Sequence, residues 1–364
     1  MMLKKRLLGN NLDELKQIAV SLGLPAFTGK QLAEWLYQKK VSSFDEMTNI
    51  SKVGREKLSL QYEVGRVTFS DCQKSIDGTR KYLFPVTCTH RNGLNAIDQV
   101  EEENLETSSI EAVMIPDDDR KTLCVSSQAG CKMGCKFCMT GRQGFHGQLS
   151  AGDIINQFLS VEESDELTNT VFMGMGEPLD NYENVKRAIE ILTAPWGFGW
   201  SPKRITLSTI GVLPYLKRYL DETKCHLAVS MHNPYPEERL SLMPVQKAYH
   251  IEDIIELLRK YDFSGQRRLS FEYTMFDGVN DDKAHADAIK RLVDGLDCRF
   301  NLIRFHKIPD FPYGTSPDIK MEMFRDRLSR AGITTTIRAS RGEDIFAACG
   351  MLAGKHKEKQ LNKE

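Results

Sequence analysis

Strand-like and helix-like segments alternate along most of this 364-residue sequence, and this alternation restricts the fold more than any other feature. Seven segments are rich in apolar and β-branched residues, as strands are: 122–126, 169–175, 204–210, 226–231, 267–276, 300–306 and 334–340. Between them, apolar residues recur at helical spacing over 152–163, 184–194, 251–261, 282–296 and 321–332. Strands that alternate with helices form parallel βα units, so we predict an α/β fold, either a doubly wound sheet or a barrel. In both architectures, ligands bind on the loops at the carboxyl ends of the strands.

Two shorter regions precede the alternating part. Residues 10–65 have the spacing of short amphipathic helices, with a Gly- and Pro-containing break at 23–30. The pattern then changes to turn-punctuated β segments, in which Asp77-Gly78 predicts a hairpin turn, and 101–109 is a polar connection to a short strand. We therefore predict a helical accessory domain at 1–65, a β-rich connecting segment at 66–115, a core at 116–350 and a polar tail at 351–364.

Composition predicts a soluble protein of the cytoplasm. The chain is 41% hydrophobic and 27% charged, which is ordinary for a globular protein. We expect neither secretion nor a membrane span, because the start lacks a signal peptide's apolar run and about eighteen apolar residues never stand together. Nine cysteines in a reducing compartment favour metal or redox chemistry over a disulfide framework. A formal net charge of −1 gives no global positive field, so any nucleic-acid interface must be local.

Three of the nine cysteines stand on one short loop directly after the first of the seven strands. Cys131, Cys135 and Cys138 have the spacing C-x3-C-x2-C, and Gly130 and Gly134 allow tight turns between them. Three thiolates on one loop can each bind a different iron of a cubane and leave the fourth iron open to a chelating ligand. A zinc site short of one ligand is the alternative, although structural zinc normally has four closed ligands.

This motif after a first βα strand resembles the signature of the radical S-adenosylmethionine (SAM) superfamily. The second strand ends in Gly174-Met175-Gly176-Glu177-Pro178, which is similar to the superfamily's glycine-rich motif for the amino group of SAM. Glycines bring backbone close to a ligand, and a carboxylate pairs with an ammonium. The resemblance implies a radical SAM partial (β/α)6-type barrel with one [4Fe–4S] cluster per chain. SAM would chelate the open iron, and one-electron reduction would cleave it to methionine and a 5′-deoxyadenosyl radical.

Five longer segments narrow the resemblance: 124–145, 173–181, 201–212, 226–234 and 338–354. Together they are similar to the RlmN/Cfr family of RNA adenosine methyltransferases, and to its RlmN branch in particular. The resemblance implies methylation at C2 of adenosine in the peptidyl-transferase centre of 23S rRNA and 3′ of the anticodon in tRNA. It also implies a flavodoxin- or ferredoxin-like one-electron reductant. Methylation at C8 of the same rRNA adenosine, the Cfr activity, stays open because both activities use the same five cysteines.

The resemblance assigns a relay to two further cysteines. Cys349 matches the cysteine that a first SAM methylates, and Cys124 matches the partner that resolves the protein–RNA adduct through a disulfide, so two SAM molecules serve each turnover. A relay suits C2 of adenine, because this carbon is not nucleophilic and cannot attack a sulfonium methyl directly. For either cysteine the alternative is a buried apolar thiol. Glu111 matches the proton acceptor at C2, with Cys124 as the other candidate.

Further positions match residues that contact SAM in the family, namely Ser208, Ser230, Met231 and His232. His306 stands where the family commonly has an asparagine that touches SAM, and its ring nitrogen can still donate a hydrogen bond. Local basic groups are the candidates for RNA contacts, with solvated surface as the alternative: Lys4, Lys5 and Arg6, Trp35 with Lys39 and Lys40, Lys203 with Arg204, and Arg267 with Arg268.

Two other classes of protein stay open. A glycyl-radical activase would also need the cluster, but it would leave Cys124 and Cys349 without a role. A non-enzymatic Fe–S protein predicts a fourth cluster ligand and has no need of the motif at 174–178. The other four cysteines need no function beyond packing: Cys72, Cys88, Cys225 and Cys298.

Overall fold

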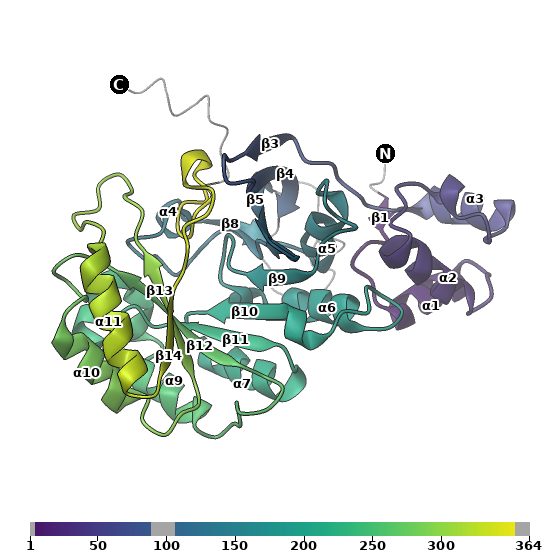
Figure 1. Ribbon diagram of the computed structural model, residues 1–364. Coiled ribbons are helices and arrows are strands. Elements are labelled where there is room, and N and C mark those ends of the chain that lie inside the picture. Colours follow the sequence, from purple (N-terminus) through teal and green to yellow (C-terminus); the bar gives the residue numbers. More distant parts are fainter. Residues whose placement is uncertain (1–3, 89–105, 354–364) are drawn as a thin grey trace.

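A curved sheet of ten strands forms the centre of the protein (Figure 1). The computed structural model describes residues 4–88 and 106–353. The predicted polar tail from residue 354 and the predicted connection at 101–105 lie outside the described residues. The strand order is β14-β13-β12-β11-β10-β9-β6-β5-β4-β3. Seven neighbouring strands of the described sheet are parallel: β6 (Arg120–Cys124), β9 (Asn169–Phe172), β10 (Ile205–Thr209), β11 (His226–Ser230), β12 (Leu269–Met275), β13 (Arg299–Arg304) and β14 (Thr334–Ile337).

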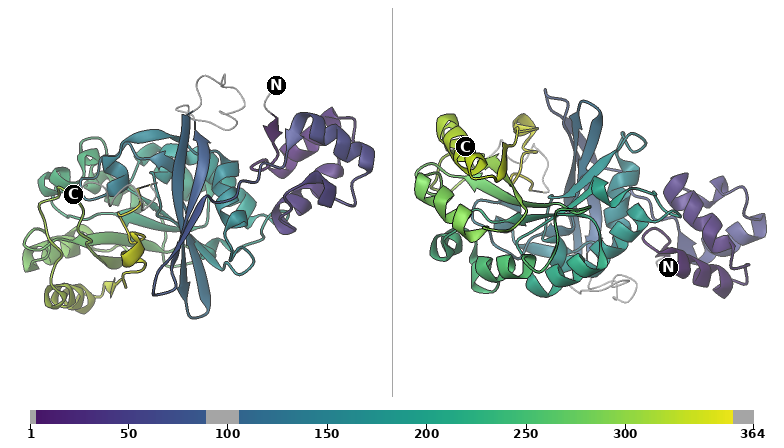
Figure 2. Two further views of the ribbon diagram at one scale, coloured as in Figure 1. Left: turned by 90° about the horizontal axis from the view of Figure 1, so that it is seen from above. Right: turned by 60° about the horizontal axis from the view of Figure 1, so that its bottom comes forward.

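Helices connect the parallel strands and form an outer layer around the sheet (Figure 2). In chain order they are α5 (Ala151–Ser160), α6 (Tyr182–Thr193), α7 (Leu213–Glu222), α8 (Pro236–Leu242), α9 (Ile251–Leu258), α10 (Lys283–Leu292) and α11 (Asp318–Arg330). Within the described sheet β14 pairs with β13 alone, so the strands form an open, partial barrel. The predicted partial (β/α)6-type barrel is therefore confirmed. Sequence patterns missed α7 and α8, both of which begin with a proline in the first turn.

The two faces of β10 illustrate how the barrel is filled. Ile205 and Leu207 are fully buried, and each such aliphatic side chain contributes roughly 1.5–3 kcal/mol through burial. Thr206 and Ser208 alternate with them, are only partly buried and line cavities inside the barrel. In β10, therefore, the apolar side chains are buried and the small polar side chains alternating with them face the cavities.

An antiparallel extension continues the sheet beyond β6 through β5 (Glu106–Asp117), β4 (Arg80–Cys88) and β3 (Asp71–Lys74). The predicted hairpin turn at Asp77-Gly78 joins β3 to β4, and the Asp77 side chain accepts a hydrogen bond from Thr79 N at 2.9 Å. The predicted polar connection was wrong for residues 106–109, which belong to β5. They pair with residues 85–88 of β4, and this cross-strand pairing outweighs their weak local preference for strand.

The N-terminal region contains α1 (Leu12–Ser21), α2 (Thr28–Ala33), a π-helical turn (Glu34–Gln38) and α3 (Lys52–Gln61), with the paired strands β1 (Lys5–Arg6) and β2 (Tyr62–Glu63). The break predicted at 23–30 is shorter in the structure, because α2 already begins at Thr28. Gly29 lies inside α2, where a Cβ would be 2.5 Å from Lys16 N of α1. Gly29 therefore permits close helix packing. Arg6 forms an ion pair with Asp153 of α5 at 3.0 Å, which fastens this region to the barrel.

A short hairpin follows β6 at its carboxyl end. It consists of β7 (Gln128–Gly130) and β8 (Phe145–Gln148), and the chain between them carries α4 (Met139–Arg142). Among the described residues, no helix combines the length and the apolar character that a membrane span requires.

Candidate active site

The three predicted cluster cysteines lie between β7 and α4 on a loop with its own hydrogen bonds. Cys131 N donates to Gly144 O at 2.8 Å, and Cys138 N donates to Cys135 O at 3.1 Å. Gly130 has a φ of 75°, and a Cβ there would clash with Gly144 O, so glycine is required. Burial raises the pKa of Cys135 to about 12. A metal that binds this thiol must therefore displace its proton.

A cavity of about 160 Å³, which we call the cysteine cavity, lies at the carboxyl ends of the parallel strands. It brings together nine of the predicted site residues: Cys131, Cys135, Cys138, Gly176, Glu177, Ser208, Ser230, His232 and Cys349. Met231 is absent from its lining, and its side chain is fully buried in the core. His306 lines a different cavity, where its ring nitrogens contact Ser340 at 3.1 Å and Glu343 at 3.2 Å.

Glu177 ties the ends of β9 and β10 together from the wall of the cysteine cavity. Its carboxylate accepts hydrogen bonds from Leu179 N at 3.0 Å, Thr209 Oγ1 at 2.6 Å and Ile210 N at 3.0 Å. Burial outweighs these bonds and raises its pKa to about 7. A carboxylate has about four lone-pair sites, so Glu177 can accept one further donor, such as an ammonium. At Gly176, whose φ is 101°, a Cβ would lie 2.5 Å from the Gln128 side chain, so this glycine permits contact between protein segments.

His232, which also lines the cysteine cavity, is held in an unusual conformation. Its φ of 56° is rare for a residue other than glycine and is stabilised by Asn280, whose side-chain amide donates to His232 O at 2.7 Å. Burial lowers the His232 pKa to about 3, so the ring is neutral at physiological pH. Nδ1 accepts a hydrogen bond from Thr274 N at 2.9 Å, which leaves the proton on Nε2 as a donor.

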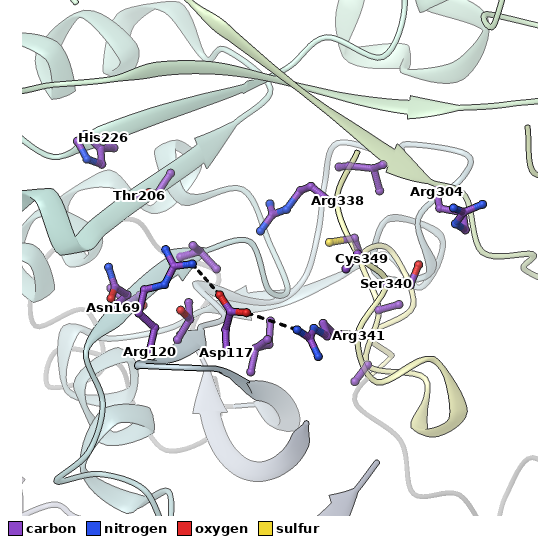
Figure 3. A pocket seen from close by; sticks show the side chains of 18 of the residues that line it. Asp117, Arg120, Asn169, Thr206, His226, Arg304, Arg338, Ser340, Arg341 and Cys349 are labelled. Carbon is purple, nitrogen blue, oxygen red and sulfur yellow. Dashed lines mark hydrogen bonds and ion pairs between the residues drawn. The ribbon is translucent and has the colours of Figure 1, made fainter. Parts of the chain in front are cut away.

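Cys349 connects the cysteine cavity to a second cavity of about 430 Å³, since it lines both. In Figure 3 the Cys349 thiol and the Arg338 guanidinium both point into this second cavity. Burial, together with the charge of the neighbouring Cys349, raises the pKa of Cys124 to about 12. Cys349 is exposed to the cavities, yet the surrounding protein desolvates its thiol and so raises its pKa as well. The two predicted relay cysteines are therefore near enough for their charges to interact.

Comparison with known proteins identifies the family. The Radical SAM superfamily model matches residues 125–289, and the model of the Ribosomal RNA large subunit methyltransferase N-terminal domain matches residues 5–64. The probable dual-specificity RNA methyltransferase RlmN of Porphyromonas gingivalis (strain ATCC BAA-308 / W83) is 56% identical over 347 residues, covering 95% of this chain and 96% of that protein. The dual-specificity RNA methyltransferase RlmN of Syntrophus aciditrophicus is 39% identical, covering 96% and 97%. The chain belongs to the RlmN family.

A solved structure agrees with this membership. The crystal structure of a radical SAM methyltransferase from Sphaerobacter thermophilus matches with a TM-score of 0.86 and 35% sequence identity, covering 96% of this chain and 100% of that one. The radical SAM domain of an RlmN family member uses a [4Fe–4S] cluster and SAM, so this protein is a radical SAM methyltransferase. The interpretations as a glycyl-radical activase and as a non-enzymatic Fe–S protein are therefore set aside.

The donor groups of the cysteine cavity fit these cofactors. Three thiols come from one loop and line the cavity. Three thiolates can each bind a different iron of a cubane and leave the fourth iron open to SAM. Glu177 offers an acceptor and His232 a donor to the same cavity, as an amino-acid group requires.

Glu111, the predicted proton acceptor, lies outside both cavities that Cys349 lines. It is buried, forms an ion pair with Lys81 at 3.0 Å and accepts a hydrogen bond from Ala353 N at 2.7 Å. Lys81 was not predicted, because nothing in the local sequence distinguishes it. In β5, Glu111 stands two residues before Val113, so their side chains lie on the same face of the sheet. Val113 pairs with Cys124, and the Cys124 side chain therefore lies on the same face as Glu111.

Sequence reasoning also missed Glu272 and Arg338. Glu272 is buried and lines the cysteine cavity; its Oε1 accepts from Asn301 at 2.8 Å, while Oε2 has no hydrogen-bond partner among the described residues. Arg338 Nη1 lies 3.6 Å from that oxygen. Positive charge on Arg338 lowers the pKa of Cys349, against the raising effect of burial. Arg338 lies inside a segment with family resemblance, which is the signal that could have found it.

The segment that carries Cys349 is fastened on both sides. Before it, Gly342 N donates to Asp77 Oδ2 at 2.9 Å, in the hairpin turn of the antiparallel extension. After it, Met139 N donates to Gly350 O at 2.8 Å, and the Ala353 N–H donates to Glu111. The extension and the cysteine loop therefore position Cys349 jointly.

Proposed function

We propose that this protein methylates C2 of adenosine in 23S rRNA, at the peptidyl-transferase centre, and in tRNA, 3′ of the anticodon. The relatives named above are dual-specificity RNA methyltransferases. The observation that carries the proposal is the position of Cys349, on the wall shared by the cysteine cavity and a larger cavity of about 430 Å³. The larger cavity has the volume of a small-ligand pocket and can receive an unstacked nucleotide.

Cys131, Cys135 and Cys138 would hold one cluster per chain, and Glu177, Ser208, Ser230 and His232 would bind and orient SAM. When bound, the reduced cluster and SAM supply a 5′-deoxyadenosyl radical and, from a second SAM, the methyl group. The buried wall around Glu177 and His232 excludes water from this chemistry. Met231 and His306 stay predicted SAM contacts, although neither side chain lines the cysteine cavity.

In this proposal Cys349 receives the methyl group in the cysteine cavity, and the methyl carbon then bonds to C2 of the adenosine in the larger cavity. The RNA is thereby joined to the Cys349 sulfur through one carbon atom. The Cys124 thiolate then attacks the Cys349 sulfur, so that a disulfide forms while the carbon–sulfur bond to the RNA breaks. The electron pair leaves on the adenine, where a proton completes the methyl group. Reduction of the disulfide by a thiol restores both cysteines for the next turnover.

Glu111 is the proposed proton acceptor at C2. In the present conformation its carboxylate is occupied by Lys81 and by Ala353 N. It would act after the C-terminal segment shifts and the Ala353 N–H releases it. Cys124, which neighbours Cys349, is the other candidate acceptor.

We propose further that residues 1–65 form an accessory domain that docks RNA, followed by the β-rich segment at 66–115 and the catalytic core at 116–350. A flavodoxin- or ferredoxin-like protein would supply the single electrons. We place the enzyme in the cytoplasm, where its RNA substrates and a reducing environment are found, and propose no association with a membrane.

Mass spectrometry tests the proposed function. The purified enzyme should carry a methyl group on the Cys349 peptide, and nucleosides from treated 23S rRNA and tRNA should contain 2-methyladenosine. If 8-methyladenosine alone is found, the assignment to C2 is wrong.

A further inference from the structure

The structure separates the basic residues that are available to a ligand from those that hold the fold. Arg267 is buried and donates hydrogen bonds to Leu220 O at 2.9 Å and Cys225 O at 3.2 Å, so it is structural. Lys40 is also committed, because it forms an ion pair with Asp165 at 2.6 Å. Neither of these predicted RNA contacts is free to bind a phosphate.

Three other basic side chains have the opposite character. Lys203, Arg204 and Arg268 are exposed, and none forms an ion pair with any residue in the described parts of the chain. They stand just before the amino-terminal ends of β10 and β12. Parallel pairing of β10, β11 and β12 places these ends along one rim of the barrel. The rim therefore carries positive charge that the protein does not neutralise.

These residues line the cavity of about 430 Å³, which we call the basic cavity. Its lining includes Arg120, Lys203, Arg204, Arg268, Arg304, Arg338 and Arg341, but a single acidic side chain, Asp117. Asp117 is shared between Arg120 at 2.6 Å and Arg341 at 3.5 Å. In a chain with a formal net charge of −1, this cavity concentrates positive charge at one place.

The His226 ring lies within the positive field of the basic cavity. Its Nδ1 accepts a hydrogen bond from Arg268 N at 3.0 Å, and its ring lies among the basic side chains. Burial lowers the pKa of His226, and the positive charges of Arg268, Lys203 and Arg299 lower it further. The basic side chains of the rim therefore face the same cavity as the His226 ring.

We propose that the basic cavity binds the phosphates next to the target adenosine, so that the RNA strand reaches Cys349 from the amino-terminal rim of the barrel. This inference rests on the proposed function and adds the direction of approach and the residues that bind the backbone. Lysine and arginine neutralise phosphates and form charge-assisted hydrogen bonds with them. Cys349 lies on the wall of the same cavity, as delivery of the flanked base requires.

Binding of an anticodon stem-loop RNA to the reconstituted enzyme tests the inference, with fluorescence anisotropy measured over a range of salt concentrations. In the variant Lys203→Gln/Arg268→Gln we expect the affinity to fall about tenfold or more. The slope of log K against log salt should decrease by about 2, because each of the two removed charges neutralises about one phosphate. The KM for RNA should rise while kcat stays within about twofold.

The matched control removes the same charge elsewhere. Lys247→Gln/Lys283→Gln changes two exposed lysines that do not line the basic cavity, and its RNA affinity should stay within about twofold of wild type. Equal losses in both double variants would overturn the inference. So would adenosine 5′-monophosphate binding as tightly as the stem-loop, because the cavity would then be a mononucleotide site.

Methylation of the Cys349 peptide without RNA separates this inference from the proposed function. Both double variants should reach the wild-type extent of this modification. If the wild-type enzyme forms no 2-methyladenosine, the proposed function is wrong. If it does, and the Lys203→Gln/Arg268→Gln variant binds RNA as well as the control does, the proposed function stands and the basic cavity is not the backbone site.

Discussion

The cysteine cavity and the basic cavity share Cys349 but are built in different ways. The cysteine cavity uses neutral or internally bonded groups, such as His232 and Glu177, which are buried and fixed by backbone hydrogen bonds. The basic cavity uses exposed charges, such as Lys203 and Arg268, which form no ion pair among the described residues. The first arrangement suits a small cofactor that must be oriented, and the second suits a polyanion that must be attracted.

The largest expected effect comes from the residue that the cavities share. Cys349→Ala should lower RNA methylation by roughly 10⁴-fold or more, because the proposed acceptor of the methyl group is removed. Iron content and SAM cleavage to 5′-deoxyadenosine should be retained, as measured by iron assay and chromatography. Cys298→Ala, at a buried cysteine outside both cavities, is the control and should stay active. Full turnover by Cys349→Ala would refute the relay.

A change confined to the cysteine cavity should affect SAM and leave RNA binding intact. Glu177→Gln replaces an acceptor of three hydrogen bonds with an amide that must turn a donor toward one of them. We expect the affinity for SAM to fall about 10- to 100-fold, the range for removal of a charged hydrogen bond. Calorimetric titration with SAM and anisotropy with RNA measure the two affinities. An equal loss of both would contradict the separation of the two cavities.

The anchor of the Cys349 segment should be sensitive to acid. Burial raises the pKa of Asp77, but hydrogen bonds from Gly342 N and from Thr79 outweigh burial and hold it at about 2. A folded-state pKa below the unfolded value of about 3.9 stabilises the protein above that pH, and this stabilisation disappears as the pH falls from about 4 through about 2. Asp77→Asn should therefore cost about 1–2 kcal/mol at pH 7 and less at about pH 3, by urea unfolding. Asp119→Asn, at an exposed position, should cost less than about 0.5 kcal/mol at both.

The smallest predicted effect concerns the RNA affinity of the basic cavity. Asp117 is the single acid in the lining of the basic cavity. Asp117→Asn should strengthen RNA binding by about two- to fivefold at low salt, because one repulsive charge is removed and Arg120 is released. Asp119→Asn changes the same charge two residues away, outside the lining, and should change the affinity less. A weaker RNA complex in Asp117→Asn would count against the basic cavity as the backbone site.

Contiguous motifs explain why the cysteine cavity could be predicted from the sequence. The cysteine loop and the segment 174–178 bring most of its wall with them, and the barrel followed from the alternation of strands and helices. The reason given for Gly176 was incomplete, since this glycine permits contact with Gln128. Which backbone a glycine approaches depends on tertiary packing, which local sequence does not contain.

The basic cavity could be predicted only in part. Arg267 and Arg268 are adjacent in the sequence, yet one is buried on backbone carbonyls and the other is exposed in the cavity. Successive side chains of an extended segment point in opposite directions, so the position at which β12 begins decides which of the two arginines is buried. Arg338 and Arg341 reach the cavity from the far end of the chain, which no local pattern reveals.

The central claim is that Cys349 links the two cavities and that Cys124 releases the product from it. The most direct test is peptide mass spectrometry of the variant Cys124→Ala after reaction with the anticodon stem-loop. The account predicts RNA joined to the Cys349 peptide through one carbon atom, with little 2-methyladenosine released. Release of methylated RNA at the wild-type rate, without any adduct on Cys349, would contradict it.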